Sequence, residues 1–336
     1  MEHFSNSPNE TGAGIQTSGT DASVLFPKKF EKKDVQRNIW LKSIISLALY
    51  LILGYYFFHS FVILILITVI IIFHEMGHFL AMKYYRYSDL GIFFIPLLGA
   101  YVSGTKREVS QKESAVILLA GPLPGIILGI ILYFLYLKNP NLSIANISFY
   151  QISILLVILN LLNLLPVYPL DGGQLLNRVF LEEESLLSKV FVFLSAALMC
   201  WAAWKLDFYI LLIFPAMMLL RLQSDSRFTA IEKKIDAEGI NADISYEELR
   251  DEDYWKIRNI LVTEHSSFKN INPAPPYKFH AKEDKIMTTI KSLLHQHLIQ
   301  DVSIAGKLLI LLIWVATFAS PWMLEMDMSF FRRFGF

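Results

Sequence analysis

The sequence contains very little cysteine and no excess charge of either sign. Its one cysteine, Cys200, excludes an internal disulfide, and its apolar surroundings predict a small buried side chain. Thirty basic residues balance thirty acidic ones, so nothing in the composition indicates nucleic acid as a partner. The first residues also lack the pattern of a cleavable signal peptide. Residues 1–25 are instead rich in Ser, Asn, Thr and Gly, which predicts a disordered tail.

Charge is scarce overall, whereas apolar residues are abundant and gathered into long runs. Charged residues make up 18% of the chain and hydrophobic residues 54%, against roughly 25% and 45–50% in soluble domains. Several runs reach the roughly 17–25 residues that a helix needs to cross a bilayer. We therefore predict an all-α multi-pass protein of the lipid bilayer, with about seven transmembrane helices near 40–58, 61–82, 114–137, 149–166, 186–204, 207–222 and 303–324.

Two segments depart from a simple helical span. The segment after the second span is too short to cross as a helix and is interrupted by Pro96, Gly99 and Gly104. We expect it to form a short membrane-associated β hairpin or strand near 91–104, supported by protein or a water-filled cavity. The third span contains the sequence Gly-Pro-Leu-Pro-Gly at 121–125, and its two prolines are expected to break or kink the helix.

The distribution of polar residues divides the chain into four parts. We predict a disordered and basic tail, a core of six membrane helices, a cytoplasmic helical region, and a C-terminal transmembrane helix with a short tail. The corresponding boundaries are 1–39, 40–222, 223–301 and 302–336.

The region 223–301 is polar and charged. It is predicted to contain three helical pieces near 226–237, 246–264 and 281–299, of which the last is amphipathic. Two interpretations remain open, a cytoplasmic element that binds a partner or gates access, and a solvated spacer. No metal site is expected at its scattered histidines, which are His265, His280, His295 and His297.

Lysine and arginine are concentrated in three places, the N-terminal stretch, the loop at 83–112 and the region 223–301. Positively charged loops lie on the cytoplasmic side of a membrane, so a cytoplasmic N-terminus is predicted. Alternating the seven spans from that start reproduces the distribution, except for Arg332 and Arg333 near the C-terminus. The expected location is the inner membrane of a bacterial cell.

The most informative motif is an HExxH sequence at 74–78, directly after an apolar run. Twelve of the thirteen residues at 61–73 are Ile, Leu, Val or Phe. On a helix, His74 and His78 lie at i and i+4 and point the same way, so both imidazoles can bind one zinc ion. Glu75 is then placed to deprotonate a water molecule. An acid at the centre of a span costs roughly 2.5–3.5 kcal/mol, so this polar group requires a functional reason.

A third ligand is predicted from a distant part of the chain. Catalytic zinc sites commonly take three protein ligands and leave one position for water. The second and fourth spans run in the same direction, and Asp171 follows the fourth span at a depth similar to that of His74 and His78. Two histidines and one carboxylate together give the three protein ligands. Considered alone, Asp171 in its Leu-Asp-Gly-Gly sequence is typical of a turn or a helix cap.

Further polar and small residues lie close to these motifs in the sequence. Asn160 and Asn163 are at i and i+3 on one face of the fourth span. They either bridge two helices by hydrogen bonds or face a substrate, and both interpretations remain open. Gly121 and Gly125 favour close helix packing rather than chemistry.

Together these motifs resemble the site-2 protease family of intramembrane zinc metalloproteases. The resemblance covers about residues 40–222. It rests on the HExxH sequence at 74–78, the AGPLPG sequence at 120–125 and the NLLPVYPLDGG sequence at 163–173. It implies that His74, His78 and Asp171 hold zinc and that Glu75 is the catalytic acid and base.

The resemblance also implies how a substrate is handled. Asn163 would place the substrate or stabilise an oxyanion. The Gly-Ala-Tyr-Val sequence that includes Gly99 and Tyr101 resembles the family's membrane-associated strand, which would pair with an unwound substrate. The implied reaction is hydrolysis of peptide bonds in or near transmembrane helices of membrane proteins, to release a signalling protein or to clear a membrane remnant.

The chain departs from the family pattern in three respects. Gly125 stands where many members have Asn, so any polar contact made there is missing. The loop between the third and fourth spans is too short for a PDZ domain. The region 223–301 is too small for a tandem nucleotide-sensing pair.

Two other functions are compatible with the histidine motif. A membrane zinc protease of the prenyl-protein-processing type would take its third ligand from a Glu on a later helix, and no such Glu lies in a predicted span. A non-catalytic zinc-binding membrane protein or metal transporter would have no need of Glu75.

Overall fold

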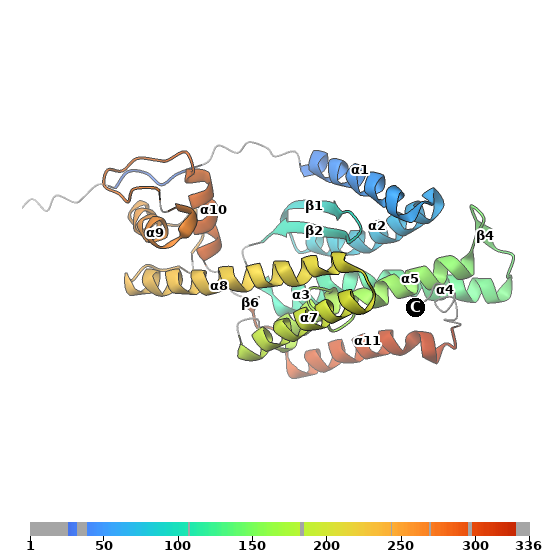
Figure 1. The fold of residues 1–336 in the computed structure, drawn as a ribbon. Helices are drawn as coiled ribbons and strands as arrows, with labels where there is room; N and C mark the ends of the chain where they lie inside the picture. Colours follow the sequence, from blue (N-terminus) through green and yellow to red (C-terminus); the bar gives the residue numbers. More distant parts are fainter. Residues whose placement is uncertain are drawn as a thin grey trace, which may run out of the picture.

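The computed structural model describes residues 26–31, 39–106, 108–181, 185–242, 244–268, 270–294 and 298–326. Apolar helices form a bundle, and a smaller group of polar helices lies at one end of it (Figure 1). The tail predicted at 1–25 lies outside the described residues, as do His295 and His297.

Five of the described helices are long and apolar enough to cross a membrane. They support a multi-pass membrane protein, whereas the predicted count of seven spans is not confirmed. The third of them is interrupted, as predicted, where Pro122 removes a backbone donor. The five are α1 (Ile39–Phe58), α2 (Phe61–Tyr84), α3 (Gln111–Ala120) followed by α4 (Pro122–Lys138), α7 (Leu186–Lys205) and α11 (Ile304–Met323).

Two shorter apolar helices occupy the fourth and sixth predicted spans. The helix α5 (Phe149–Asn163) begins at a capping box made by Ser148. A 3₁₀ turn, η2 (Tyr209–Leu212), leads into α8 (Ile213–Ala237). Because α8 is continuous, the predicted separation of the sixth span from a polar helix near 226–237 is wrong.

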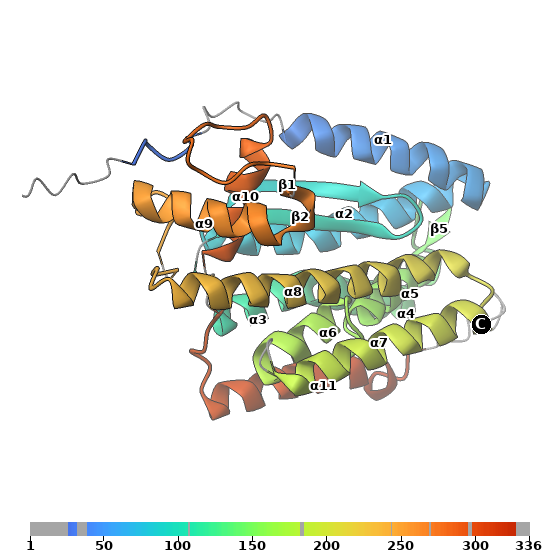
Figure 2. The same ribbon diagram turned by 60° about the vertical axis from the view of Figure 1, so that its left-hand side comes forward.

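A β hairpin lies beside α1 and α2, which confirms the hairpin predicted near 91–104 (Figures 1 and 2). Its strands are β1 (Ser88–Ile95) and β2 (Gly99–Thr105), antiparallel, with Ile95 opposite Gly99 at the turn. The strand β1 packs against α1, where the Phe94 N–H donates to the Ser46 hydroxyl at 3.1 Å. One edge of the hairpin is therefore covered by a helix.

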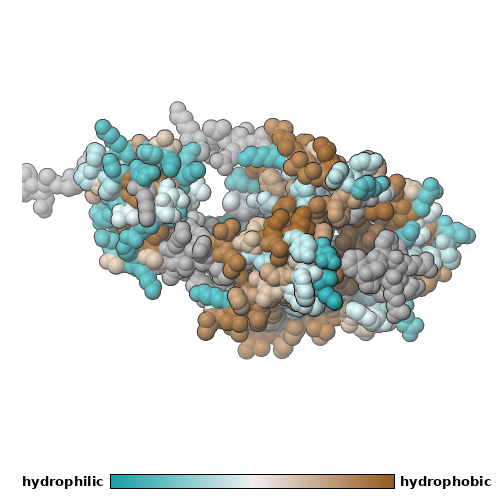
Figure 3. Space-filling model, in the orientation of Figure 1, coloured by the Kyte–Doolittle hydropathy of each residue, from teal (hydrophilic) through white to brown (hydrophobic). Residues whose placement is uncertain are grey.

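Large apolar side chains point outward from the membrane helices. Ile52 of α1, Trp204 of α7 and Leu220 of α8 are each more than 60% exposed. Figure 3 shows apolar residues over the middle of the molecule and hydrophilic residues at both ends. Cys200 belongs to the outward face of α7, so the prediction of a buried thiol is wrong. A helix with lipid on one side exposes apolar residues instead of burying them.

The polar helices form a separate core, which we call the polar unit. It comprises the end of α8, α9 (Asp251–Glu264), η3 (Ser266–Phe268) and α10 (Glu283–Leu293). Trp255 and Leu261 lie at its centre. The guanidinium of Arg258 pairs with the Glu283 carboxylate at 2.6 Å, and both side chains are 1% exposed. Burial and a hydrogen bond to that carboxylate raise the pKa of Tyr254 above its usual range.

The segment 26–31, which precedes α1 in the sequence, lies against the polar unit. The Lys29 ammonium donates to three backbone carbonyls, those of Tyr246, Glu247 and Leu249, at 2.7–2.8 Å. The Trp255 indole donates to the Pro27 carbonyl at 2.8 Å. The N-terminal stretch and the polar unit therefore lie on the same side of the membrane helices.

The polar unit is also tied to the helix bundle at its other end. A parallel pair joins β3 (Val109–Ser110) to β6 (Leu298–Ile299), and the Asp301 carboxylate accepts from the Lys112 N–H at 3.0 Å at the start of α3. A second short pair, β4 (Ser143–Ile144) with β5 (Ile147–Ser148), lies at the opposite end of the molecule.

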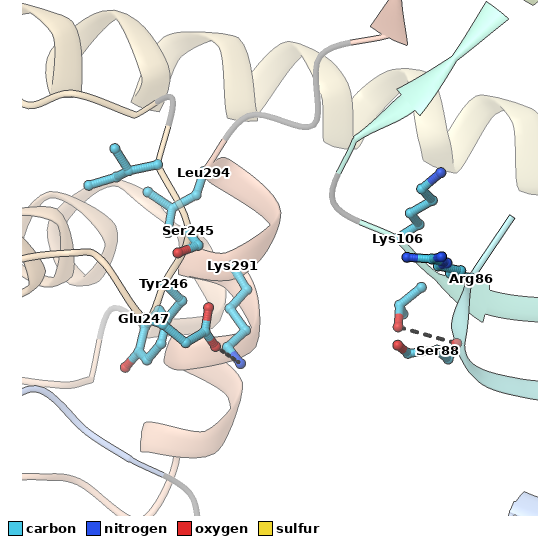
Figure 4. Close-up of a pocket in the computed structure, with 10 residues that line it drawn as sticks. Arg86, Ser88, Lys106, Ser245, Tyr246, Glu247, Lys291 and Leu294 are labelled. Atoms are coloured by element: carbon cyan, nitrogen blue, oxygen red, sulfur yellow. Dashed lines mark hydrogen bonds and ion pairs between the residues drawn. The ribbon is translucent and has the colours of Figure 1, made fainter. Parts of the chain in front are cut away.

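A cleft of about 370 Å³ separates the polar unit from the base of the hairpin. Arg86, Ser88 and Lys106 lie on the hairpin side, and residues such as Glu247 and Lys291 face them from the polar unit (Figure 4). The two lysines are each paired with an acid, Lys106 with Glu113 and Lys291 with Glu247.

Candidate metal centre

Both histidines of the HExxH sequence point from α2 into the helix bundle. His74 is 6% exposed and His78 is 8% exposed. Their rings stand edge to face, with the two Nε2 atoms 3.1 Å apart. The i, i+4 spacing predicted this shared direction, because α2 is helical throughout the motif.

Asp171 reaches the same point from a tight turn. It is the first residue of a short helix, α6 (Asp171–Leu175), which a π-helical turn, η1 (Leu176–Phe180), continues. A Cβ atom on Gly172 would lie 1.9 Å from the Leu164 carbonyl oxygen, so only glycine fits where the turn folds back on the end of α5. The Trp314 indole in α11 donates to that same carbonyl at 2.9 Å. A helix 150 residues away thus stabilises the turn that presents Asp171.

The three ligand atoms form a nearly equilateral triangle. Asp171 Oδ2 lies 3.1 Å from His74 Nε2 and 3.2 Å from His78 Nε2. Ligand bonds of 2.0–2.1 Å in a tetrahedral zinc site place neighbouring ligand atoms about 3.3–3.4 Å apart. The triangle therefore has the dimensions of one face of such a tetrahedron. Among the residues that the structure describes, this is the cluster of His, Cys, Asp or Glu with metal-ligand geometry.

The outer nitrogens of both rings are held by acceptors. His74 Nδ1 lies 2.7 Å from Asn160 Oδ1, and His78 Nδ1 lies 2.8 Å from the Ile117 carbonyl. An acceptor at each Nδ1 places the proton there and leaves the lone pair on Nε2. Three electron-pair donors then face one another at about 3 Å, an arrangement that suits a cation between them. Asn160 thus bridges two helices, one of the two roles expected for it.

Glu75 lies beside the triangle and against the hairpin. It is 6% exposed, and its carboxylate accepts a hydrogen bond from the backbone of Val102 in β2. The Phe94 N–H donates to Ser46 in α1, on the side away from β2. Phe94 and the opposite residue Ala100 are therefore a pair without mutual backbone hydrogen bonds, and the N–H and carbonyl of Ala100 point away from β1. Val102 lies two residues further along β2, so its N–H and carbonyl also point away from β1. The outer edge of β2 therefore faces the α2 motif.

The remaining predicted site residues form no described hydrogen bond with the triangle. Asn163 is half-buried at the last position of α5. Gly99 lies at the hairpin turn with a φ of +113°, and no atom lies within 4 Å of where its Cβ would be. Tyr101 is 48% exposed and stacks near Phe93. Their predicted roles with a substrate stay predictions.

Sequence reasoning missed three contacts that hold the centre. They are the Ile117 carbonyl on His78, the Trp314 indole on the Leu164 carbonyl, and the Val102 backbone on Glu75. Ile117 and Val102 contact the centre through backbone groups, which every residue type has, so their identity in the sequence does not predict the contact. Trp314 offered a weak signal, since an indole N–H inside an apolar helix requires an acceptor.

Three kinds of comparison with known proteins find similarities to part of the chain. Residues 62–149 match the family described as Peptidase family M50. This match confirms the resemblance to the site-2 proteases that the motifs predicted. It covers α2, the hairpin, α3 and α4, and it ends before Asp171.

Two curated proteins are similar over about a third of the chain. Stage IV sporulation protein FB of Bacillus subtilis is 29% identical over 126 residues, which are 36% of this chain and 41% of that protein. A zinc metalloprotease of Methanocaldococcus jannaschii is 30% identical over 122 residues, which are 35% of this chain and 34% of that protein. The chain thus spans less than half the length of either relative.

Among solved structures, a site-2 protease from Methanocaldococcus jannaschii is similar with a TM-score of 0.39 and 24% identity. The similarity covers 53% of this chain and 84% of that chain.

Proposed function

We propose that this chain, with its Peptidase family M50 segment at residues 62–149, is a zinc-dependent intramembrane endopeptidase. Its substrates would be membrane proteins, cleaved in or near their transmembrane helices. The observation that carries the proposal is the triangle of His74, His78 and Asp171, which lies next to an acid and inside a bundle of apolar helices.

His74, His78 and Asp171 are the residues that would hold the zinc ion. When bound, zinc supplies a Lewis acid that lowers the pKa of water and polarises a peptide carbonyl. The Nδ1 acceptors fix the orientation of the two imidazoles so that each Nε2 faces the triangle, and the Asp171 carboxylate contributes the third donor atom. This donor set of two nitrogens and one oxygen leaves one side of the triangle free for water and substrate.

Glu75 would move the proton in the reaction. Its carboxylate takes the proton of the attacking water and returns it to the nitrogen of the leaving amine. The backbone of Val102 fixes one of its oxygens by a hydrogen bond, so the carboxylate is oriented before substrate arrives.

The outer edge of β2 would bind the substrate as an added strand. Ala100 directs its N–H and its carbonyl away from β1, and Val102, whose N–H is directed at Glu75, directs its carbonyl the same way. The helix α1 already covers the other edge of the hairpin. A helix has no free backbone groups for such pairing, so the substrate must unwind before it binds. Gly99, Tyr101 and Asn163 would contact this unwound segment.

The orientation of the chain is part of the proposal. We assign the N-terminus and the polar unit to the cytoplasmic side of a bacterial inner membrane. The contact between residues 26–31 and the polar unit supports their being on one side. Many of the chain's Lys and Arg residues lie in these segments and few in the loops at 59–60, 138–148 and 205–207, which supports the cytoplasm. The polar unit itself is proposed to bind a cytoplasmic partner or to gate access to the cleft.

The decisive test compares Glu75→Gln with the wild-type chain, both full-length and in detergent or liposomes. We expect about one zinc per wild-type chain and cleavage of a model transmembrane substrate. Glu75→Gln should retain zinc and lose cleavage by at least about a thousandfold, since the general base acts directly on water. Glu264→Gln, in the polar unit, is the matched control and should cleave normally.

Two results would contradict the proposal. Cleavage by Glu75→Gln at the wild-type rate would exclude its role as the base. Zinc uptake into sealed vesicles without any proteolysis would instead support a metal transporter.

A further inference from the structure

Asn160 holds one of the metal-binding histidines without belonging to the three ligand groups. We propose that Asn160 is a positioning residue, which fixes the ring of His74 so that Nε2 faces His78 and Asp171. We further assign to Gly125 the role of leaving the space that the Asn160 amide needs. Both assignments rest on the proposed zinc site.

The amide of Asn160 has only one orientation that satisfies its neighbours. The side chain is 1% exposed, and its Nδ2 donates to the Leu156 carbonyl at 2.7 Å. The oxygen of the amide must then be the atom that lies 2.7 Å from His74 Nδ1. An oxygen can only accept, so His74 carries its proton on Nδ1 and keeps the Nε2 lone pair free for a metal.

Gly125 in α4 faces this amide at close range. A Cβ atom on residue 125 would lie 2.3 Å from Nδ2 and 2.9 Å from Oδ1 of Asn160. Real Cβ atoms do not approach this closely, so the buried amide would have to shift if residue 125 carried a side chain. Even the smallest side chain at 125 would therefore displace the oxygen that holds His74.

The two histidines differ in how they are held. His78 donates to the main-chain carbonyl of Ile117, in the last turn of α3, where helix carbonyls lack intrahelical partners. No side-chain substitution removes that acceptor. His74 depends on a side chain, so its support can be removed by mutation, and the effect on the metal can be measured.

The experiment measures zinc affinity of the full-length chain by competition with a chelator, and not activity. Asn160→Leu has nearly the same shape and lacks the acceptor, and it should weaken zinc binding about 10–100-fold. Asn160→Asp keeps an acceptor oxygen for His74 and loses the donation to Leu156. It should bind zinc within a few-fold of wild type.

This pair of variants separates positioning from a merely structural role. If Asn160 mattered only through its bond to Leu156, both variants would lose affinity equally, and that result would overturn the proposal. Equal affinity in Asn160→Leu and wild type would overturn it as well. A wild-type chain that binds no zinc would instead refute the proposed function.

Gly125→Ala gives a second route that leaves Asn160 in place. It should weaken zinc binding about as much as Asn160→Leu does. In an Asn160→Ala background, the Gly125→Ala change should have no further effect, because the amide it displaces is gone. Additive losses in this double-mutant cycle would show that Gly125 acts independently of Asn160 and would overturn its assigned role.

Discussion

The membrane helices and the polar unit bury opposite kinds of residue. The helix bundle encloses His74, Glu75 and Asn160, each less than 9% exposed, while its outer faces present large apolar side chains. The polar unit encloses Trp255 and Leu261 and presents charged residues outward. The helix bundle thus has polar groups inside and apolar groups outside, whereas the polar unit has the reverse arrangement.

The difference shows why a helix bundle that faces lipid can hold polar residues in its interior. In the polar unit, burial of apolar side chains drives folding, and a buried charge needs a partner such as the Arg258–Glu283 pair. In the membrane bundle, the interior is available to polar groups because lipid already solvates the apolar surface. The buried Ser153 hydroxyl, for example, donates to the Gly129 carbonyl of the neighbouring helix.

The largest effect is expected from breaking the buried ion pair of the polar unit. Arg258→Met leaves the Glu283 carboxylate buried without its cation, which should destabilise the unit by about 3–5 kcal/mol. Hydrogen exchange of α9 and α10 measures this loss directly. Combining Arg258→Met with Glu283→Gln removes the orphan charge and should recover much of the stability. Unchanged exchange in the single variant would mean that the pair contributes nothing.

A charge on the outward face of a membrane helix should have the next largest effect. Leu312, near the centre of α11, is 65% exposed, and Ile304, at the start of that helix, is 80% exposed. Lysine costs roughly 2.5–3.5 kcal/mol at the centre of a span, whereas a lysine at its end reaches the interface. Leu312→Lys should therefore reduce membrane insertion and Ile304→Lys should not, as measured by alkaline extraction. Equal insertion would mean that α11 does not face lipid.

The smallest effect is expected where the N-terminal segment docks on the polar unit. Lys29→Met keeps the aliphatic stem and removes the donor to three carbonyls, which should cost about 1 kcal/mol at this half-exposed site. Hydrogen exchange at residues 26–31 should become about fivefold faster. Lys28→Met is the matched control, because Lys28 is exposed, and should leave exchange unchanged. Equal exchange rates in the two variants would mean that the hydrogen bonds of the Lys29 ammonium do not stabilise the docked segment.

The sequence predicted those parts of the centre that depend on local spacing. The i, i+4 histidines required only that α2 be helical, and the two prolines indicated the break at Pro122. The hairpin followed from Pro96 and Gly99 in a segment too short to span. In each case the signal lies within a few residues of the feature.

Asp171 was matched to the two histidines from the parallel direction of two spans, but other features that join distant segments could not be predicted. The docking of residues 26–31 and the support of the Asp171 turn by Trp314 have no periodicity to reveal them. The continuity of α8 was missed for another reason. Its sequence turns polar near residue 221, which suggested an end, but α8 continues as one helix to Ala237.

The outer edge of β2 sets a length requirement on any strand that pairs with it. From Ala100 to Gly104 the edge is five residues long. Five residues measure about 7.5 Å as a helix and about 16 Å as a strand. A transmembrane segment that unwinds along β2 therefore lengthens by about 9 Å. The cleft and the polar unit lie at the base of the hairpin, which is one of the two ends toward which the added length can extend. Under the proposed function, access to the centre would depend on how far a substrate can slide as well as on its local sequence.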